Sequence, residues 1–201
     1  MDRAAAWSIV CEFVKDVGLR RHMLAVEAAM RFYARRLNED EHQWGLAGLL
    51  HDFDWEIHPN LTDHPASGAP ILRERGVDEN VITAIFSHNE HHTGVKPERP
   101  IDYALNACDE ITGLVIAVAL VRPTKDIRDA EVKSVKKKWK EKYFAAGVHR
   151  EEVEATTAAF SKACFDGKLD LWEHVGNVLA AMQERAAELD LDGRLTQPGQ
   201  A

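Results

Sequence analysis

Apolar residues recur every three or four positions along most of the chain, which is the spacing that places side chains on one face of an α-helix. Trp7, Val10 and Val14 share such a face in a first segment, and Met23 and Val26 share one in the next. Alternation of apolar and polar residues, the pattern typical of a half-buried β-strand, does not extend over any length. The pattern therefore predicts an all-α protein.

Glycine, proline and capping residues divide this pattern into separate helices. Gly94, Pro97 and Pro100 indicate a loop over residues 91–100, and Asp78 is a candidate N-cap for the helix that follows it. Helices are expected at about residues 7–18, 19–37, 41–52, 65–76, 78–88, 101–121, 129–142, 150–165 and 169–189. We expect one domain over residues 1–190, a helical bundle with extra C-terminal helices at 123–190, and a disordered tail at 191–201.

Composition narrows the class of protein. The 201 residues carry a formal net charge of -8, which disfavours a general nucleic-acid binder. The longest uncharged apolar run, residues 111–121, is too short to cross a bilayer, and the N-terminus lacks the pattern of a signal peptide. Cys11, Cys108 and Cys164 are widely spaced and have apolar neighbours, so we expect buried free thiols in a reducing compartment. These features predict a cytoplasmic protein with no membrane partner.

Histidines are concentrated in one part of the chain. Six of the ten fall between positions 51 and 92, namely His51, His58, His64, His88, His91 and His92. Histidine is the commonest metal ligand in proteins. His58, His91 and His92 lie in loop-like stretches and are expected to face solvent, although His91 or His92 could take the place of His88. His42, His149 and His174 have no companions and are expected at the surface.

The helical pattern indicates which of these side chains can meet. Five helices each bring one or two nitrogen or oxygen ligands to an end or an inward face, as helical bundles do when they build a metal site. An unpaired Asp109 would be costly in its apolar helix. We therefore predict one ion held by His22, His51, Asp52 and Asp109, and another held by His64, His88 and Asp52. Mixed imidazole and carboxylate ligands suit one or two ions of Fe, Mn, Co, Ni or Zn better than Ca.

The order His22, then His51-Asp52, then Asp109 resembles the H…HD…D signature of the HD-domain superfamily of metal-dependent phosphohydrolases. HPASGAPILRERG after His64 and VITAIFSHNE through His88 resemble the regions of the extra ligands in its two-metal members, so the likeness covers about residues 19–122. DEITG, ALVRP and EVKSVKKK are similar to small bacterial HDIG-type hydrolases. The chain departs from two-metal signalling phosphodiesterases, because HDFDW stands in place of HDIGK and Asn89 replaces a second histidine. That departure weighs against cleavage of cyclic dinucleotides.

The predicted function is that of a metal-dependent phosphohydrolase, a phosphomonoesterase or phosphodiesterase that acts on a nucleotide or another small phosphorylated metabolite. Asp52 is expected to take part in catalysis as a bridging ligand. Asp54 or Glu56 would orient a ligand histidine or accept a proton, with Asp54 preferred. The residues expected to bind substrate are positively charged, namely Arg21, Arg122, Lys133 and Lys136. The lysines of residues 133–140 also fit a merely solvated helix face.

Two other functions remain open from the sequence. A di-iron oxygenase could use the same scaffold and would be recognised by iron content and oxygen consumption. A non-enzymatic regulator could bind nucleotide through the lysine-rich helix, and its binding would depend on salt and survive loss of His51 or Asp52. Nucleic acid is an unlikely partner for an acidic chain, a small phosphorylated molecule is the expected one, and a homodimer is possible.

Overall fold

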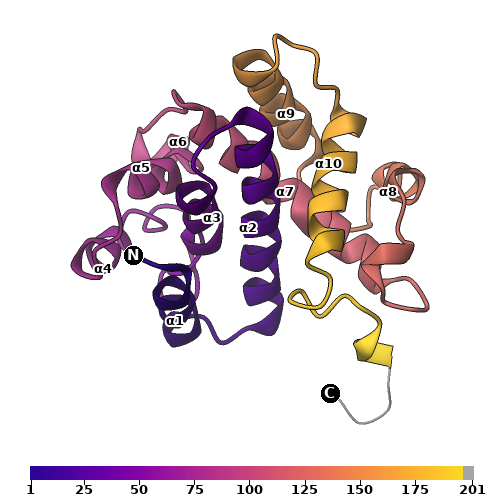
Figure 1. The fold of residues 1–201 in the computed structure, drawn as a ribbon, viewed down its shortest axis with the longest axis horizontal. Helices are drawn as coiled ribbons and strands as arrows, with labels where there is room; N and C mark the ends of the chain where they lie inside the picture. The colour runs from indigo at the N-terminus through magenta and orange to yellow at the C-terminus, as the bar shows by residue number, and fades with distance from the viewer. Residues whose placement is uncertain (197–201) are drawn as a thin grey trace. The chain divides into compact units, whose positions relative to one another are not determined.

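The computed structural model describes residues 1–196, and within them the chain forms ten α-helices and no β-strand (Figure 1). The prediction of an all-α fold is confirmed. The helices are α1 (Arg3–Phe13), α2 (Val17–Leu37), α3 (Glu41–Leu50), α4 (Ala69–Glu74), α5 (Glu79–Ser87), α6 (Glu90–Thr93), α7 (Pro100–Leu120), α8 (Val132–Trp139), α9 (Arg150–Cys164) and α10 (Leu171–Glu184). Two short 3-10 turns, η1 (Ile127–Asp129) and η2 (Arg194–Thr196), complete the secondary structure.

The chain divides into two compact units, residues 1–106 and the residues from 107 onward. The boundary falls inside α7, so that α1 to α6 belong to the first unit and α8 to α10 to the second. The expectation of one domain over residues 1–190 stays a prediction.

Aspartate side chains begin several helices of the first unit. Asp16 accepts a hydrogen bond from the backbone N–H of Leu19, and Asp40 caps α3 in the same way. Asp78 accepts from Asn80 at the start of α5, which confirms the predicted cap. These side chains satisfy backbone donors that have no partner within the helix.

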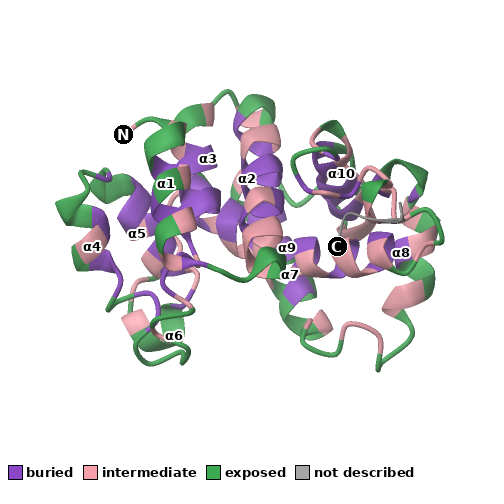
Figure 2. Cartoon of the chain, turned by 90° about the horizontal axis from the view of Figure 1, so that it is seen from below, coloured by how far each residue is buried: buried purple, intermediate pink, exposed green. Residues whose placement is uncertain are grey.

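Helices α2 and α3 pack closely and run in opposite directions (Figure 1). Gly48 makes this approach possible, because a Cβ there would lie 2.8 Å from the backbone nitrogen of Glu27 and 2.9 Å from the backbone carbon of Val26. Most of α3 is buried, as is one face of α2 (Figure 2). The contact between Gly48 and Val26 fixes the register of the two helices, and this register positions the site described below.

Glu27 carries a charge inside this unit that the sequence pattern did not single out. The residue is 3% exposed. Arg3 donates two hydrogen bonds to its carboxylate, at 2.6 and 2.8 Å, and Arg31 donates a third at 2.8 Å. Two arginines therefore compensate the buried carboxylate, and Arg3 also ties α1 to α2.

In the second unit, α10 packs against α8, α9 and η1. The rings of Trp139 on α8 and Trp172 on α10 meet edge to face, with centroids 5.7 Å apart. His174 was expected at the surface, and this expectation is wrong. The side chain is fully buried, and its Nε2 lies 2.9 Å from the carbonyl oxygen of Ala107. A single histidine on a helix gives no sign in the sequence of which face it occupies.

Several predicted boundaries move because turns replace helix. The predicted helix at 65–76 is helical only over α4, and residues 51–63 of the approach to it are mostly turns. The loop predicted at 91–100 contains the short helix α6. The tail expected to be disordered from residue 191 is structured at its start, where Leu191 is buried and accepts a hydrogen bond from Ile127 at 2.8 Å. Residues 197–201 lie outside the described residues.

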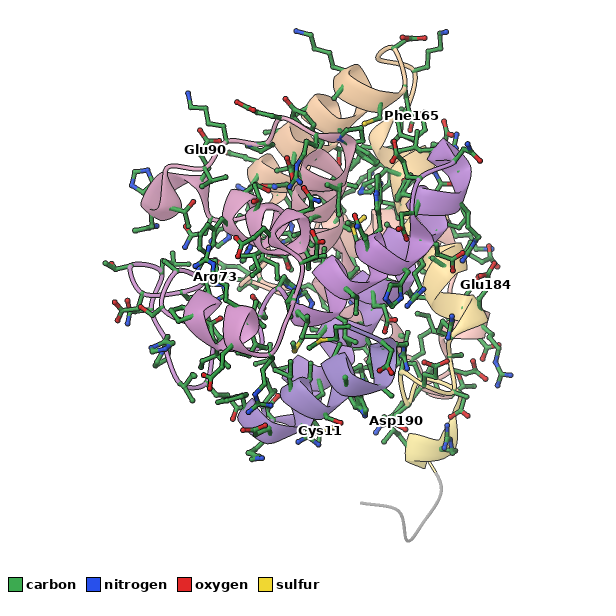
Figure 3. All side chains as sticks on the ribbon, turned by 60° about the vertical axis from the view of Figure 1, so that its left-hand side comes forward. Cys11, Arg73, Glu90, Phe165, Glu184 and Asp190 are labelled. Carbon is green, nitrogen blue, oxygen red and sulfur yellow. The ribbon has the colours of Figure 1, made fainter. Side chains whose placement is uncertain are left out.

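The three cysteines are free thiols in different surroundings. Cys108 is buried, as expected, and burial raises the pKa of its thiol. Cys11 on α1, which is labelled in Figure 3, is only half-buried, and so is Cys164 at the end of α9. The expectation of three buried thiols therefore holds for Cys108 alone.

One helix among residues 1–196, α7, is long and apolar enough to cross a membrane by length and composition. The share of its most apolar window that is buried is 56%. The core helix of a soluble protein passes the same test, so this helix is consistent with the expected soluble protein.

Candidate metal centre

The register of α2 and α3 brings two predicted ligands together. His22 lies one turn before Val26 on α2, and His51 follows Gly48 by nearly one turn at the end of α3. Because the helices are antiparallel and Val26 faces Gly48, these steps lead to the same place. The Nε2 atoms of His22 and His51 lie 3.2 Å apart.

A second pair of histidines lies beside the first. Helix α5 packs against α3 and ends at His88, whose ring centroid is 5.4 Å from that of His51. His64 was predicted to open a helix, but it lies in a turn five residues before α4 begins. The Nε2 atoms of His64 and His88 are 2.9 Å apart. His64 is 2% exposed, and the side chain of His88 is 7% exposed.

The carboxylate of Asp52 separates the two pairs. Its Oδ2 lies 3.7 Å from Nε2 of His22 and 3.4 Å from Nε2 of His51. Its Oδ1 lies 3.3 Å from Nε2 of His64 and 3.8 Å from Nε2 of His88. Each carboxylate oxygen thus faces one histidine pair, which is the arrangement of a bridging ligand.

The other nitrogen of three rings has an oxygen acceptor. Nδ1 of His51 donates to the carbonyl of Gly48 at 2.9 Å, and Nδ1 of His88 donates to the carbonyl of Ile85. Nδ1 of His64 faces Oδ1 of Asp54 at 2.8 Å. A carbonyl oxygen and an ionised carboxylate oxygen can only accept, so these bonds place the hydrogen on Nδ1 and leave Nε2 as the metal-binding nitrogen.

These residues fit a bound divalent metal. Two neutral rings with Nε2 atoms at 2.9 Å would direct lone pairs at each other, and a proton or a cation relieves that repulsion. Burial lowers the pKa of His64, but hydrogen bonds and charges from Asp52 and Asp54 outweigh burial and raise this pKa from 6.5 to about 9. The ligand atoms of His22, His51 and Asp52 lie within 4.8 Å of one another, and so do those of Asp52, His64 and His88. The surroundings therefore favour positive charge, and the imidazole and carboxylate donors suit a transition metal.

Asp54 supports His64 from behind. Its side chain is fully buried, and its Oδ2 has no hydrogen-bond partner within residues 1–196. A Cβ at Gly68 would lie 2.5 Å from that oxygen, so only glycine leaves room for the carboxylate. Asp54 is thus placed to orient His64.

Asn89 has a role that the sequence did not reveal. It stands beside His88, and its amide donates to the carbonyl oxygens of Leu61 and His64 at 2.8 and 2.6 Å. These bonds hold the turn that carries His64. The only sign of this role in the sequence was that Asn89 stands where two-metal signalling phosphodiesterases have a second histidine.

Five further residues were predicted for the site, one of them in the first unit and four in the second. Arg21 precedes His22 on α2 and is half-buried. Asp109, Arg122, Lys133 and Lys136 belong to the second unit, and their part in the site stays a prediction. In that unit Arg122 donates to Ser134, Lys133 pairs with Glu131 at 2.7 Å, and the ammonium of Lys136 lies 4.9 Å from the centre of the Trp172 ring.

The other histidines of the sequence are outside these pairs. His91 and His92 are exposed, and His92 bonds to the side chain of Asn89 at 2.9 Å. His149 is exposed but has companions, contrary to expectation: its Nδ1 lies 3.2 Å from Glu110 and 3.9 Å from Glu152. These three side chains could also hold an ion.

Comparison with known proteins identifies the family. The model of the HD domain matches residues 19–119, half of the chain, and the chain therefore belongs to the HD-domain family. HD domains are generally metal-dependent phosphohydrolases. Ribonuclease Y from Oleidesulfovibrio alaskensis is 29% identical over 94 residues, which are 46% of this chain and 18% of that protein. No solved structure matches the chain.

Proposed function

We propose that this protein is a metal-dependent phosphohydrolase that uses one or two divalent transition-metal ions to hydrolyse a nucleotide or another small phosphorylated metabolite. The observation that carries the proposal is the carboxylate of Asp52, whose two oxygens each face a pair of histidine Nε2 atoms. Membership of the HD-domain family supports it.

The protein's own residues prepare this site for a charged substrate. His22, His51, His64 and His88 present nitrogen ligands, and Asp52 bridges the two pairs. When bound, a divalent ion lowers the pKa of a coordinated water and polarises phosphoryl oxygens. Asp109 is proposed as a further ligand, and Arg21, Arg122, Lys133 and Lys136 as groups that hold substrate phosphate.

Asp54 acts through His64 in this proposal. The carboxylate is buried behind the imidazole ring and accepts its Nδ1 hydrogen. That position fits an orienting group better than a proton acceptor for substrate, because a proton acceptor must reach the reacting atoms. Of the two roles considered for Asp54, we therefore propose the orienting one.

The test is phosphate release from a substrate panel with Mn, Co, Ni, Zn or Fe. The panel contains nucleoside monophosphates and sugar phosphates as monoesters, and dinucleotides and short RNA as diesters. RNA is included because the relative that matches is named a ribonuclease. Turnover of one class that disappears in Asp52→Ala would establish the reaction and decide between monoester and diester.

Oxygen uptake is measured in parallel on iron-loaded protein. Uptake of oxygen without phosphate release would replace the proposal with the di-iron oxygenase. Nucleotide binding that survives Asp52→Ala, with no turnover of any substrate, would replace it with the regulator.

A further inference from the structure

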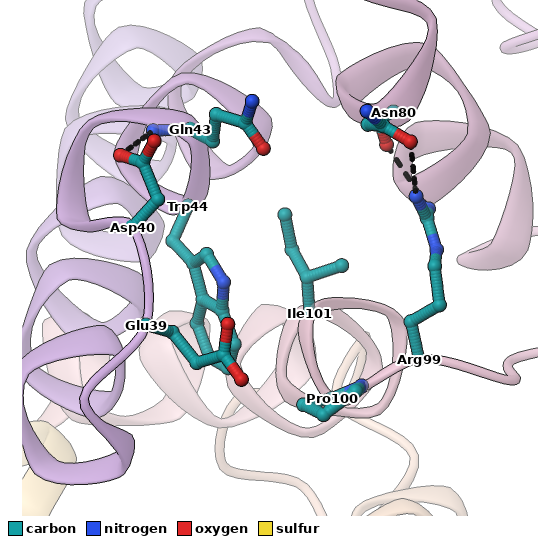
Figure 4. A pocket seen from close by; sticks show the side chains of 8 residues that line it. All are labelled: Glu39, Asp40, Gln43, Trp44, Asn80, Arg99, Pro100 and Ile101. Atoms are coloured by element: carbon teal, nitrogen blue, oxygen red, sulfur yellow. Dashed lines mark hydrogen bonds between the residues drawn. The ribbon is translucent and has the colours of Figure 1, made fainter.

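A cavity of about 210 Å³ lies at the N-terminal end of α3, within the first unit (Figure 4). Its lining comes from the link between α2 and α3, the first turn of α3, the start of α5 and the start of α7. His51 lies at the other end of α3, about 15 Å away by the rise of a helix. The cavity is therefore separate from the metal centre, and its volume fits only a small ligand.

The charges around the cavity favour a cation. Glu39 and Asp40 both line it, and within residues 1–196 Glu39 has no positively charged partner at ion-pair distance. Arg99 lines the opposite side, but Asp102 neutralises it with contacts of 2.6 and 3.1 Å. Asn80 accepts two further hydrogen bonds from the same guanidinium. The uncompensated charge at the cavity is negative.

Trp44 offers a hydrogen-bond donor that no described protein atom uses. The residue is 3% exposed, and its indole nitrogen lies on the edge of the ring that faces Ile101 (Figure 4). Within residues 1–196 no protein atom accepts a hydrogen bond from this N–H, and its nitrogen is not among the fully enclosed atoms without a partner, so it is open to the cavity. An indole N–H in a largely buried side chain usually has a partner. A ligand in the cavity can supply one.

We propose that this cavity binds a small ammonium compound that also carries a hydrogen-bond-accepting oxygen, as an amino alcohol or an amino acid amide does. The ammonium pairs with Glu39, the oxygen accepts from the indole N–H of Trp44, and the carbon atoms contact Ile101. Each part of the ligand thus matches one feature of the lining, namely the negative charge of Glu39, the indole donor of Trp44 and the apolar side chain of Ile101. The site does not depend on the proposed phosphohydrolase activity.

The probe is L-valinamide, and its matched control is isovaleramide, which has the same carbon skeleton without the amine. The readout is the indole N–H resonance of Trp44 in ¹⁵N-labelled protein, assigned by its loss in Trp44→Phe. We expect a saturable shift with valinamide at a dissociation constant on the order of 1 mM. Isovaleramide should leave the resonance where it is.

Glu39→Gln tests the charge without threatening the fold, because Glu39 is exposed. We expect it to weaken valinamide binding about tenfold, the usual effect of losing one charge-assisted hydrogen bond. Glu90→Gln, at another exposed position of the same unit, is the control and should bind as the wild type does. Equal binding of the two probes, unchanged binding by Glu39→Gln, or no saturable shift would overturn the proposal.

Discussion

His64 in the first unit and His174 in the second are both buried, at 2% and 0% exposure, yet their pKa values move in opposite directions. Burial lowers the pKa of His174 to about 4, and its bond to the Ala107 carbonyl opposes this only in part. Burial also disfavours the charged form of His64, but Asp52 and Asp54 outweigh burial and raise its pKa to about 9.

The difference distinguishes a histidine with a structural role, His174, from a histidine of the candidate metal centre, His64. A neutral carbonyl satisfies one N–H of His174 and leaves the ring uncharged inside the core. Two carboxylates beside His64 create a place that favours positive charge, and a divalent cation can supply it in place of protons. Burial of a histidine therefore says little about function, whereas the charge of its partners says a great deal.

The largest effect is expected when the carboxylate shared by both histidine pairs is removed. In Asp52→Ala we expect metal affinity to fall by more than about 100-fold, because outer-shell partners alone contribute 10- to 100-fold. Metal content after dialysis against a weak chelator measures it. Glu90→Ala, at an exposed position of the same unit outside these ligand groups, should keep the wild-type metal content. Full metal content in Asp52→Ala would refute the bridging role.

The second test uses the raised pKa of His64 in metal-free protein. The folded-state pKa of His64 lies above the unfolded value of 6.5. Protonation of His64 therefore stabilises the folded protein fully below pH 6.5, and this stabilisation is lost as the pH rises to about 9. The loss is about 3 kcal/mol in the free energy of unfolding. Urea unfolding with chelator at pH 6.5 and 9 measures it. His64→Gln should remove this dependence of the unfolding free energy on pH, and His58→Gln should retain it. An equal dependence in the wild type and both variants would contradict the prediction.

The third test concerns His174 in the second unit, which should make stability depend on pH in the opposite direction. The folded-state pKa of His174 lies below 6.5, so the unfolded chain binds a proton that the folded chain does not between about pH 4 and 6.5. Stability should fall by about 3 kcal/mol as the pH drops through this range. Urea unfolding of wild type and His174→Gln measures the difference, with His42→Gln as the exposed control. A His174→Gln protein as acid-sensitive as the wild type would show that the proton is bound elsewhere.

The fourth test addresses the orientation of His64 alone. Asp54→Asn keeps the shape of the side chain but removes the charge that faces Nδ1, and we expect metal affinity to fall about 10- to 100-fold. Calorimetric titration with Mn or Ni measures it. Asp63→Asn, in the same turn but exposed, is the matched control. A drop shared by both variants would indicate a loosened turn instead.

The site was predictable where a ligand lies at a helix end or on a helix face. His22, His51 and His88 follow from periodicity, since each helix was recognisable and its terminus was marked by caps or breakers. His64 was chosen for its neighbours in sequence, and its position in a turn rather than in a helix was missed. That turn depends on Asn89, which is 25 residues away, and on Asp54 behind it. Contacts at such separation leave no local pattern.

By itself the sequence determined the helical class and most of the helices, and it predicted which histidine and aspartate side chains bind a metal, because these depend on local spacing and residue chemistry. Tertiary structure decided which histidines face one another, which ring nitrogen is free, and that His174 is buried and neutral. The physical reason is that these outcomes depend on contacts between residues far apart in the sequence. At Gly48, for example, a missing side chain lets the backbones of α2 and α3 meet and sets the register of His22 and His51.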